Sequence, residues 1–401
     1  MKNIVENIST EVRAEYDVAV AGGGIAGIAA ALSAAREGAR VVLLERGFIL
    51  GGLATAGLVT IYLPLCDGEG NQVSFGIAEE LLRLSIKHGA EARYPAAWLE
   101  GGTHEQRCRK RFEVQYNPWI FAIEAERLLL DAGVTILYGT TVTAVHKEEG
   151  RISALILEGK TDRYAIEVKN CVVDATGDAD VCYLAGARTS VYSGGNGIAA
   201  WYYAAGYKED EHRAGLKQLG VLENAEGRGG SVIREGKYKG FITDEIPAFM
   251  YDSHALTLKD ILARRESGEP ELVPTSIASI PQLRMTRRLV GHYDLHDDEI
   301  GKEFPDSVGM CSDWRYRGPV YEIPFRTLWG EDVRNLLVAG RCISVTDEMW
   351  DITRVVPVCA VTGEAAGVAA AMTDDLETLD IKALRSTLEQ RGVKLHKRAK
   401  M

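Results

Sequence analysis

The chain is poor in basic charge relative to acidic charge. Its 46 Lys and Arg residues are outnumbered by 57 Asp and Glu residues, which gives a formal net charge of −11 at pH 7. Binding to nucleic acid or to an anionic membrane surface depends on clustered Lys and Arg, and the sequence has no long basic run. We therefore expect neither a nucleic-acid partner nor attachment to such a membrane.

Long apolar runs are also missing. No stretch approaches the roughly 20 apolar residues that cross a bilayer, so no membrane span is predicted. Residues 1–15 carry several charged side chains and lack the apolar centre of a secretory signal. A cytoplasmic location is the default expectation.

The cysteines form no recognisable pattern. They number seven, are scattered along the chain and include no C-x-x-C pair. This spacing supports neither a disulfide framework nor a zinc site. We expect no metal site and interpret the cysteines as buried or incidental thiols.

Glycine, in contrast, is abundant. It accounts for 42 of the 401 residues, above the usual share of about 7%. Glycine is used where the backbone bends tightly or approaches another group closely, so its positions are informative. The remaining composition, 46% hydrophobic and 26% charged, suits one large globular domain with an insertion.

The first organised unit lies in residues 16–45. Residues 16–21 and 40–45 are each predicted to form a short apolar strand. Between them, a glycine cluster leads into a helix of small residues that runs from residue 25 to about residue 37, with Gly38 as a C-cap. A right-handed crossover makes the two strands parallel neighbours.

A G-x-G-x-x-G motif lies at the start of this helix. Gly22 suits the tight turn, Gly24 lets a pyrophosphate approach the backbone, and Gly27 lets helix and strand pack closely. The free N–H groups at the helix N-terminus then face the phosphates. Glu45 closes the second strand, where it would accept hydrogen bonds from an adenosine ribose. This combination predicts a bound dinucleotide.

Further elements are predicted along the rest of the chain. A helix over residues 118–132 places Glu124 and Glu126 on its solvent face, and residues 134–138 form a strand. An antiparallel meander and a strand ending in glycine follow, over residues 141–147, 152–158, 164–168 and 172–177. The C-terminal elements are a strand, an Ala/Gly/Val-rich helix and a charged amphipathic helix, over residues 336–340, 355–372 and 384–401.

Between these blocks, the β-α-β order is lost. Residues from about 190 to 325 interleave aromatic, charged and turn-forming residues. We interpret residues 190–325 as an inserted α+β cap, or substrate domain. Residues 1–189 and 326–401 then form the N-terminal and C-terminal parts of one cofactor domain.

Several stretches together carry a family resemblance. A second glycine loop, Gly51-Gly52-Leu53-Ala54-Thr55, soon follows Glu45. Three further segments occur later in the chain: Val173-Asp174-Ala175-Thr176-Gly177-Asp178, Asn335-Leu336-Leu337-Val338-Ala339-Gly340-Arg341 and Arg354-Val355-Val356-Pro357. These segments resemble sequence motifs of the glutathione-reductase-like flavoprotein superfamily. The nearest group is that of FAD-dependent oxidoreductases related to fumarate reductase and succinate dehydrogenase flavoproteins. The resemblance covers nearly the whole chain.

This resemblance implies the fold and the cofactor. The fold is α/β, with a Rossmann-like FAD-binding domain, a parallel sheet, a β-meander and the inserted cap. FAD is expected to be non-covalent, because the stretch from Gly47 to Gly57 lacks the linking histidine of flavinylated relatives. The residues expected at the cofactor are Gly22, Gly24, Gly27, Glu45, Arg46, Gly52, Leu53, Ala54, Thr55, Val142, Ala175, Thr176, Gly177, Asp178, Gly340, Arg341, Arg354, Val355, Pro357 and Gly363.

The resemblance also implies a role for the helix that follows Arg354. In the superfamily, the N-terminus of this helix faces the pyrimidine edge of the flavin. Its N–H groups, with Arg354, would stabilise negative charge on the reduced flavin. A structural salt bridge is the alternative role for Arg354.

Three arginines are substrate-side candidates within the inserted segment. Arg284, Arg287 and Arg288 are predicted to lie on a helix, where residues three and four apart share a face. Arginine binds carboxylates in a bidentate way, and the family resemblance adds delivery of a proton. One hypothesis is an acid-bearing substrate held by Arg284 or Arg287. The alternative pairs the arginines with the acidic residues of segment 294–299.

Acid/base candidates follow from residue type alone. His254, His292 and Tyr293 lie in the same segment, and His and Tyr are common proton donors and acceptors in catalysis. For each of them, a surface or structural role is the alternative.

These observations predict an FAD-dependent oxidoreductase that moves a hydride between a small organic substrate and flavin N5. The chain has no second G-x-G-x-x-G, so we expect an external electron donor or acceptor rather than an NAD(P)H domain. The alternatives are an FAD-dependent monooxygenase and a flavin-bound redox subunit or sensor that acts through a protein partner. A homodimer is the expected oligomeric state.

Overall fold

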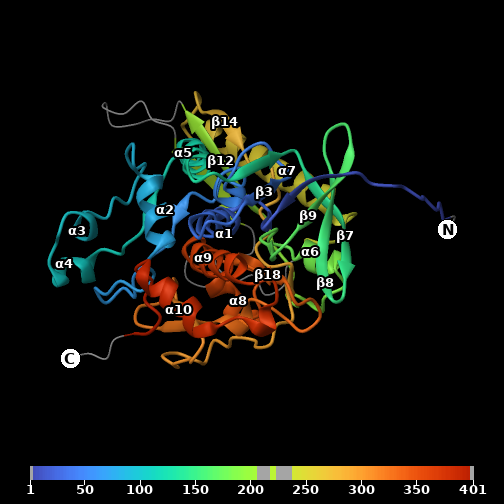
Figure 1. Cartoon of the computed structure of the whole chain (residues 1–401). Coiled ribbons are helices and arrows are strands. Elements are labelled where there is room, and N and C mark those ends of the chain that lie inside the picture. The colour runs from blue at the N-terminus through green and yellow to red at the C-terminus, as the bar shows by residue number, and fades with distance from the viewer. Residues whose placement is uncertain (1–2, 206–216, 223–236, 398–401) are drawn as a thin grey trace.

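A five-stranded parallel sheet forms the centre of the molecule (Figure 1). The computed structural model describes residues 3–205, 217–222 and 237–397. The sheet order is β18-β10-β2-β3-β6, and all four neighbouring pairs are parallel. The strands are β2 (Val18–Ala21), β3 (Val41–Glu45), β6 (Thr135–Tyr138), β10 (Val172–Asp174) and β18 (Leu336–Val338). The predicted α/β, Rossmann-like fold is confirmed.

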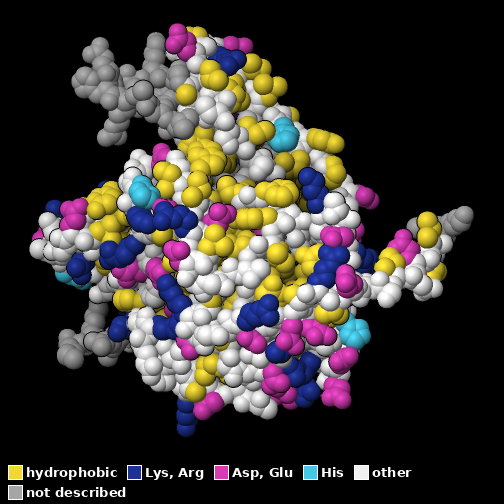
Figure 2. All heavy atoms as spheres, turned by 45° about the horizontal axis from the view of Figure 1, so that its top comes forward, with side chains coloured by type: hydrophobic (Ala, Val, Ile, Leu, Met, Phe, Trp, Pro, Cys, Tyr) yellow, Lys and Arg dark blue, Asp and Glu magenta, His cyan; other side chains and the backbone are white. Residues whose placement is uncertain are grey.

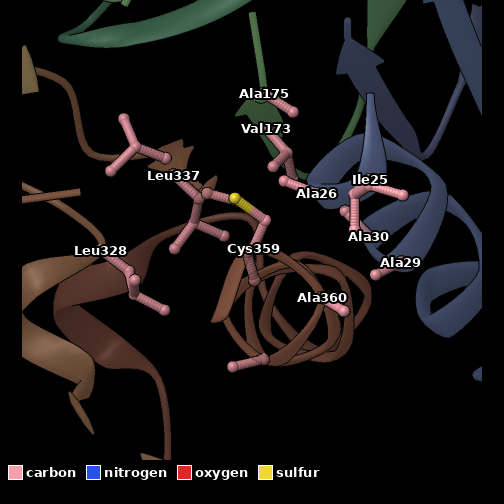
Figure 3. Close-up of a cluster of buried hydrophobic side chains, with 14 of the residues drawn as sticks. Ile25, Ala26, Ala29, Ala30, Val173, Ala175, Leu328, Leu337, Cys359 and Ala360 are labelled. Atoms are coloured by element: carbon pink, nitrogen blue, oxygen red, sulfur yellow. The ribbon is translucent and has the colours of Figure 1, made fainter. Parts of the chain in front are cut away.

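Two helices pack tightly against each other beside this sheet. They are α1 (Ile25–Arg36) and α9 (Val356–Met372), both composed largely of small residues. A Cβ atom built on Gly363 of α9 would lie 2.3 Å from the carbonyl oxygen of Ala26, and one on Gly367 would lie 2.1 Å from that of Ala30. Figure 3 shows Ala26, Ala29 and Ala30 of α1 on the side that faces α9. Both glycines therefore permit backbone contact between the helices.

The β-meander is present as predicted. Strands β7 (Thr141–Glu148), β8 (Arg151–Glu158) and β9 (Arg163–Val168) pair antiparallel in that order. A fourth strand, β1 (Val12–Tyr16), pairs parallel with β9. The sequence did not predict β1, because its residues are mostly exposed and include charged side chains.

The inserted segment contains a small antiparallel sheet covered by a long helix. The sheet consists of β12 (Ala199–Ala205), β13 (Lys217–Leu222) and β14 (Val273–Ile277), and the helix is α7 (Glu245–Glu266). Small separate cores, such as the one containing Tyr238 and Phe249, fill this part. The later strands β16 (Ser307–Ser312) and β17 (Val320–Pro324) instead contribute side chains to the main core.

Two predicted helices differ from the structure. Residues 284–286 are irregular, and Arg287 and Arg288 begin strand β15 (Arg287–Leu289), which pairs antiparallel with β11 (Thr189–Val191). The predicted helix over residues 284–288 is therefore wrong. The C-terminal helix is α10 (Ile381–Gln390), which is shorter than predicted because the chain turns at Gly392, with a φ of +89°. The last four predicted positions lie outside the described residues.

The remaining elements lie around this framework. They are α2 (Ile77–Ser85), α3 (Ala96–Leu99), α4 (His104–Arg109), α5 (Pro118–Asp131), α6 (Asp180–Leu184), α8 (Asp347–Thr353), β4 (Ile61–Tyr62) and β5 (Val114–Gln115). Figure 2 shows side chains of both charge signs interspersed on the surface, with apolar side chains grouped in places. Within the described residues, no single helix is both long and apolar enough to cross a membrane; α8 and α9 reach that length only as a pair bent by 91°.

Candidate functional site

A cavity of about 550 Å³ opens along the carboxyl edge of the parallel sheet. Its wall includes the residues at which β2, β3, β10 and β18 end or continue into loops: Ala21, Gly22, Leu44, Glu45, Ala175, Ala339 and Gly340. Ligands of open α/β sheets bind outside the carboxyl ends of the strands. The cavity volume also lies within the range of about 300–1,000 Å³ that is usual for ligand pockets.

The turn from β2 to α1 forms one wall of this cavity. Gly22 has a φ of +100°, and a Cβ on it would lie 2.5 Å from the carbonyl oxygen of Ala175. Gly27 packs against the same turn, since its Cβ would lie 1.8 Å from the carbonyl oxygen of Gly22. Gly24 also lines the cavity, and a Cβ there would meet no atom within 4 Å. Gly22 and Gly27 are thus required by backbone contact, whereas Gly24 leaves open space.

The start of α1 presents donors beside this open space. The first hydrogen bond of the helix runs from the N–H of Ile28 to the carbonyl of Gly24, at 2.9 Å. The N–H groups of the preceding helical residues have no partner within the helix. Together with the helix dipole, these groups suit an anionic ligand such as a phosphate.

Glu45 lies at another end of the cavity, held in a fixed orientation. Its Oε2 atom accepts the N–H of Gly23 at 2.8 Å, and its Oε1 atom accepts the N–H of Gly47 at 2.6 Å. Each carboxylate oxygen has capacity for a further hydrogen bond. Glu45 and Arg46 both line the cavity, so Glu45 is available to a ribose hydroxyl.

The second glycine loop lies against the first. Gly51 donates its N–H to the carbonyl of Gly23 at 2.8 Å. The following residues Gly52, Leu53 and Ala54 line the cavity. Thr55 does not, because it is buried and its hydroxyl donates to the carbonyl of Leu50 at 2.5 Å. Its role is to fix the loop.

The segment after β10 adds a charged wall. The lining residues are Ala175, Thr176, Gly177, Asp178 and Asp180, and Val142 of β7 lines the cavity as well. Asp178 accepts hydrogen bonds from Arg341 at 3.2 Å and from the hydroxyl of Thr286 at 2.7 Å. Burial, and then the neighbouring Asp178 and Asp174, raise the pKa of Asp180 to about 6.

Arg287 binds two residues of this charged wall. Its guanidinium forms an ion pair with Asp180 at 2.7 Å and donates to the carbonyl of Asp178 at 2.9 Å. Arg288 pairs with Asp294 at 3.1 Å, as the alternative in the sequence analysis anticipated for an arginine of this group. Neither arginine lines the cavity.

The first turn of α9 forms a further part of the cavity wall. Arg354, Val356 and Cys359 line the cavity. Val355 and Pro357 lie at this turn without lining the cavity, and Gly363 lies further along α9, where it packs against α1. Arg354 forms an ion pair with the buried Asp351, with its Nε atom 3.0 Å from Oδ1. Burial raises the pKa of the Cys359 thiol to about 12, so the thiol is neutral at physiological pH.

One wall of the cavity comes from the inserted segment. Ser279, Ile280, Pro281 and Leu283 line it, and sequence reasoning did not find them, because nothing in this short irregular stretch distinguishes it from any other loop. Arg284 follows directly. Its Nη1 atom is buried and has no hydrogen-bond partner among the described residues. Burial and the charge of Arg354 lower the pKa of Arg284 to about 10.

The three acid/base candidates lie elsewhere. His254 is exposed on α7, and His292 packs on the ring of Trp329 with a centroid distance of 4.1 Å. The Tyr293 hydroxyl donates to Glu299 beside Lys302. None of the three lines the cavity, so the structure does not bring them to the predicted cofactor residues.

The cavity fits the dinucleotide that the resemblance implies. Open space over Gly24 and the free N–H groups of α1 suit a pyrophosphate, and the oriented carboxylate of Glu45 suits a ribose. The wall also includes the N-terminus of α9, which carries a partial positive charge, and the guanidinium of Arg354, which is paired with Asp351. These features lie along a single cavity, as an extended FAD molecule requires.

Comparisons with known proteins agree with this assignment. Residues 17–219 and 221–388 match the sequence model of the FAD dependent oxidoreductase family. A vinyl phenol reductase of Lactiplantibacillus plantarum is 29% identical over 188 residues, which are 40% of this chain and 38% of the relative. A probable electron transfer flavoprotein-quinone oxidoreductase of Escherichia coli is 27% identical over 285 residues, 65% of this chain and 57% of the relative. The chain thus spans only part of the length of these curated relatives.

Solved structures with a similar course of the chain are related to it only at low sequence identity. A geranylgeranyl bacteriochlorophyll reductase-like protein from Thermoplasma acidophilum has a TM-score of 0.48 and 14% identity, covering 94% of this chain and 83% of its own. The anhydrotetracycline hydroxylase of Streptomyces rimosus has a TM-score of 0.45 and 13% identity, covering 94% of this chain and 65% of its own.

Proposed function

The chain belongs to the FAD-dependent oxidoreductase family, and from this premise we propose that it moves a hydride between a small organic substrate and N5 of its flavin. When bound, FAD supplies the two-electron chemistry. The residues of the chain hold the cofactor, exclude water and orient the substrate. Within the family, we propose a relationship to fumarate reductase and succinate dehydrogenase flavoproteins.

One observation carries this proposal. The glycine turns and Glu45, which suit a dinucleotide, share a single cavity with Ser279, Pro281 and Leu283 of the inserted segment. A redox sensor that acts only through protein contacts needs no such second wall. A wall supplied by the insertion instead supports a small-molecule substrate held against the cofactor.

The first turn of α9 supports redox chemistry at that wall. Its N–H groups and the positive end of its dipole stabilise negative charge in the cavity. The guanidinium of Arg354 adds to this stabilisation. Cys359, in the same turn, is a neutral thiol because of its raised pKa. A nucleophilic role for Cys359 is therefore not part of the proposal.

Electrons must also be exchanged with a second reactant. The chain has a single G-x-G-x-x-G, which the cavity uses at the turn before α1. The relatives named as a reductase and as a quinone oxidoreductase support an external electron donor or acceptor. We propose such a partner in place of an internal NAD(P)H site.

The test is an anaerobic screen. The purified holoenzyme is photoreduced, and organic compounds are added while flavin absorbance is recorded. The expected result is reoxidation by an organic substrate, with one reduced product per flavin. Reoxidation by oxygen alone would support a sensor instead, and incorporation of isotopically labelled oxygen into a product would identify a monooxygenase. Either result would overturn the proposal.

A further inference from the structure

The solvent face of α7 carries a stripe of apolar side chains. They are Ala248, Tyr251, Ala255, Leu258 and Leu262, and all five are exposed. The three larger ones have exposed fractions between 46% and 71%. Within residues 247–263, Lys259 is the only exposed residue with a fixed charge. Figure 2 shows apolar side chains grouped in the upper part of the molecule, where the inserted segment lies. We call these five residues the α7 stripe.

The opposite face of the same helix is partly polar. Phe249 and Ile261 belong to the small cores beneath α7, but Ser253 and Thr257 are buried as well. The hydroxyl of Thr257 donates to the carbonyl of Ser253 at 3.0 Å. An ordinary surface helix turns apolar residues to the core and polar residues to solvent. Apolar residues on both faces are typical of a helix that is covered on both.

The α7 stripe has the spacing of a helix–helix contact. Its residues follow one another three and four positions apart in alternation, as in the seam of a coiled coil. When two copies of α7 pair antiparallel about a twofold axis, Leu258 lies opposite Ala255 of the second copy. Leu262 then lies opposite Tyr251 of the second copy. A small side chain facing a larger one near the axis lets the two helices approach closely.

The charges beside the α7 stripe match such a pair. Asp252 and Lys259 flank the stripe on the same side, one heptad apart. In the antiparallel pair, Asp252 therefore lies beside Lys259 of the second copy, and the symmetry repeats this contact. Lys259 has no ion pair among the described residues. Asp252 accepts hydrogen bonds from Lys237 and Tyr238 through its Oδ2 atom, and its Oδ1 atom can accept another.

We propose that the α7 stripe binds the α7 stripe of a second copy of this chain in an antiparallel, twofold-symmetric pair. The inference goes beyond the proposed redox reaction and does not depend on it, because no residue of the stripe lines the cavity. A lipid surface fits less well, since helices that lie on membranes carry several Lys or Arg residues on their polar face. A contact through one helix from each copy is small, so we expect reversible association with a dissociation constant on the order of micromolar.

Sedimentation of the holoenzyme over a range from about 1 to about 100 µM measures this association. Leu258→Glu places a charge in the centre of the pair. Its matched control is Ile123→Glu on the solvent face of α5, because Ile123 and Leu258 are 60% and 57% exposed. We expect the wild type and the control to form dimers that dissociate on dilution. The dissociation constant of Leu258→Glu should be at least about tenfold higher, because its charge would lose water in the contact.

Melting of the dilute proteins separates a lost contact from a lost fold. Leu258 is exposed in the single chain, so Leu258→Glu should melt with the wild type at concentrations where both are monomers. Its flavin absorbance should be unchanged, since Leu258 does not line the cavity.

Charge reversal tests the antiparallel direction. Lys259→Asp places an added carboxylate beside Asp252 of the second copy, and Asp252→Lys places an added ammonium beside Lys259 of the second copy. Each single variant should raise the dissociation constant about threefold or more, because two like-charged contacts form in every dimer. The double variant restores opposite charges and should return to within about twofold of the wild type.

Three results would overturn the inference. One is a wild type that stays monomeric over the whole range; if it also floats with phosphatidylglycerol vesicles, the α7 stripe is a membrane contact instead. Another is a dimer that Leu258→Glu leaves intact, which would place the interface elsewhere. The third is a double charge variant no tighter than the single variants, which would exclude the antiparallel pairing.

Discussion

The Oε2 atom of Glu364 in α9 accepts a hydrogen bond of 2.8 Å from the N–H of Ile77, the first residue of α2. The contact depends on Gly76, since a Cβ there would lie 2.4 Å from the same oxygen. Glu364 is 2% exposed. Burial raises its pKa from 4.5 to about 7, against the opposing effect of the Ile77 N–H.

This pKa makes stability depend on pH. The folded chain binds the Glu364 proton more tightly than the unfolded chain does, so the free energy of unfolding falls as pH rises from 4.5 to about 7. Glu364→Gln keeps an acceptor for Ile77 and removes the charge. We expect the variant to lose this slope and to exceed the wild type at pH 8 by at most about 3 kcal/mol.

Urea unfolding at several pH values between 5 and 8 measures the slope. Glu105→Gln, which changes an exposed carboxylate paired with Arg109, is the control and should keep the wild-type slope. An unchanged slope in Glu364→Gln would show that Glu364 does not titrate in this range.

Two glycines of one motif should respond differently to alanine. Gly27→Ala introduces a Cβ 1.8 Å from the carbonyl oxygen of Gly22, and we expect a loss of at least about 2 kcal/mol in the free energy of unfolding, as in other overpacked sites. Gly24→Ala meets no atom within 4 Å, so the apoprotein should change by about 0.5 kcal/mol or less.

The same pair separates folding from cofactor binding. The new methyl group of Gly24→Ala projects into space that the pyrophosphate is expected to use, so FAD affinity should fall about tenfold or more. Flavin fluorescence titration of the refolded apoprotein measures this affinity. Equal FAD affinities of Gly24→Ala and the wild type would contradict the position of the pyrophosphate.

Glu45 should contribute to FAD affinity through its free acceptor capacity. We expect Glu45→Ala to weaken binding by about 1–3 kcal/mol, because charge-assisted hydrogen bonds to the ribose are lost. Glu45→Gln keeps one acceptor and should lose less. Since the carboxylate also holds the N–H groups of Gly23 and Gly47, thermal melting of each apoprotein must be measured beside the FAD titration. An unchanged affinity in Glu45→Ala would place the adenosine elsewhere.

The cofactor half of the molecule was predictable because its requirements are local. The backbone contact between Gly22 and Gly27 admits no side chain at Gly27, and such a constraint leaves a fixed spacing in the sequence. The strand-turn segments that end in Gly177 and Gly340 follow the same logic, since both glycines have positive φ angles and line the cavity.

The inserted segment was less predictable because its contacts are distant in the sequence. The spacing of Arg284, Arg287 and Arg288 suits a helix face, yet two of these arginines lie on a strand. Adjacent side chains of a strand point to opposite faces, and accordingly Arg287 pairs with Asp180 whereas Arg288 pairs with Asp294. These partners determine the local structure, and no short window of sequence contains them both.

Glu124 is a second case in which a distant contact overrode a local pattern. The sequence predicts it on the solvent face of α5, but it is 6% exposed. Its Oε2 atom accepts a hydrogen bond from Lys87 at 2.8 Å, and the Nε2 atom of His88 lies 2.9 Å from Oε1. The prediction for Glu124 is therefore wrong, because the chain after α2 covers this part of α5 and supplies Lys87 and His88 as its partners.

This environment gives Glu124 the opposite pH dependence to Glu364. The hydrogen bonds from Lys87 and then His88 lower its pKa from 4.5 to about 2. Its contribution to stability is therefore present above 4.5 and is lost as pH falls through about 2. Glu124→Gln should be less stable than the wild type at neutral pH, and the difference should shrink steadily on acidification. Urea midpoints between pH 7 and pH 3 measure it, with Glu126→Gln as the control, and a difference that stays constant with pH would show that the Glu124 charge is not what holds this contact.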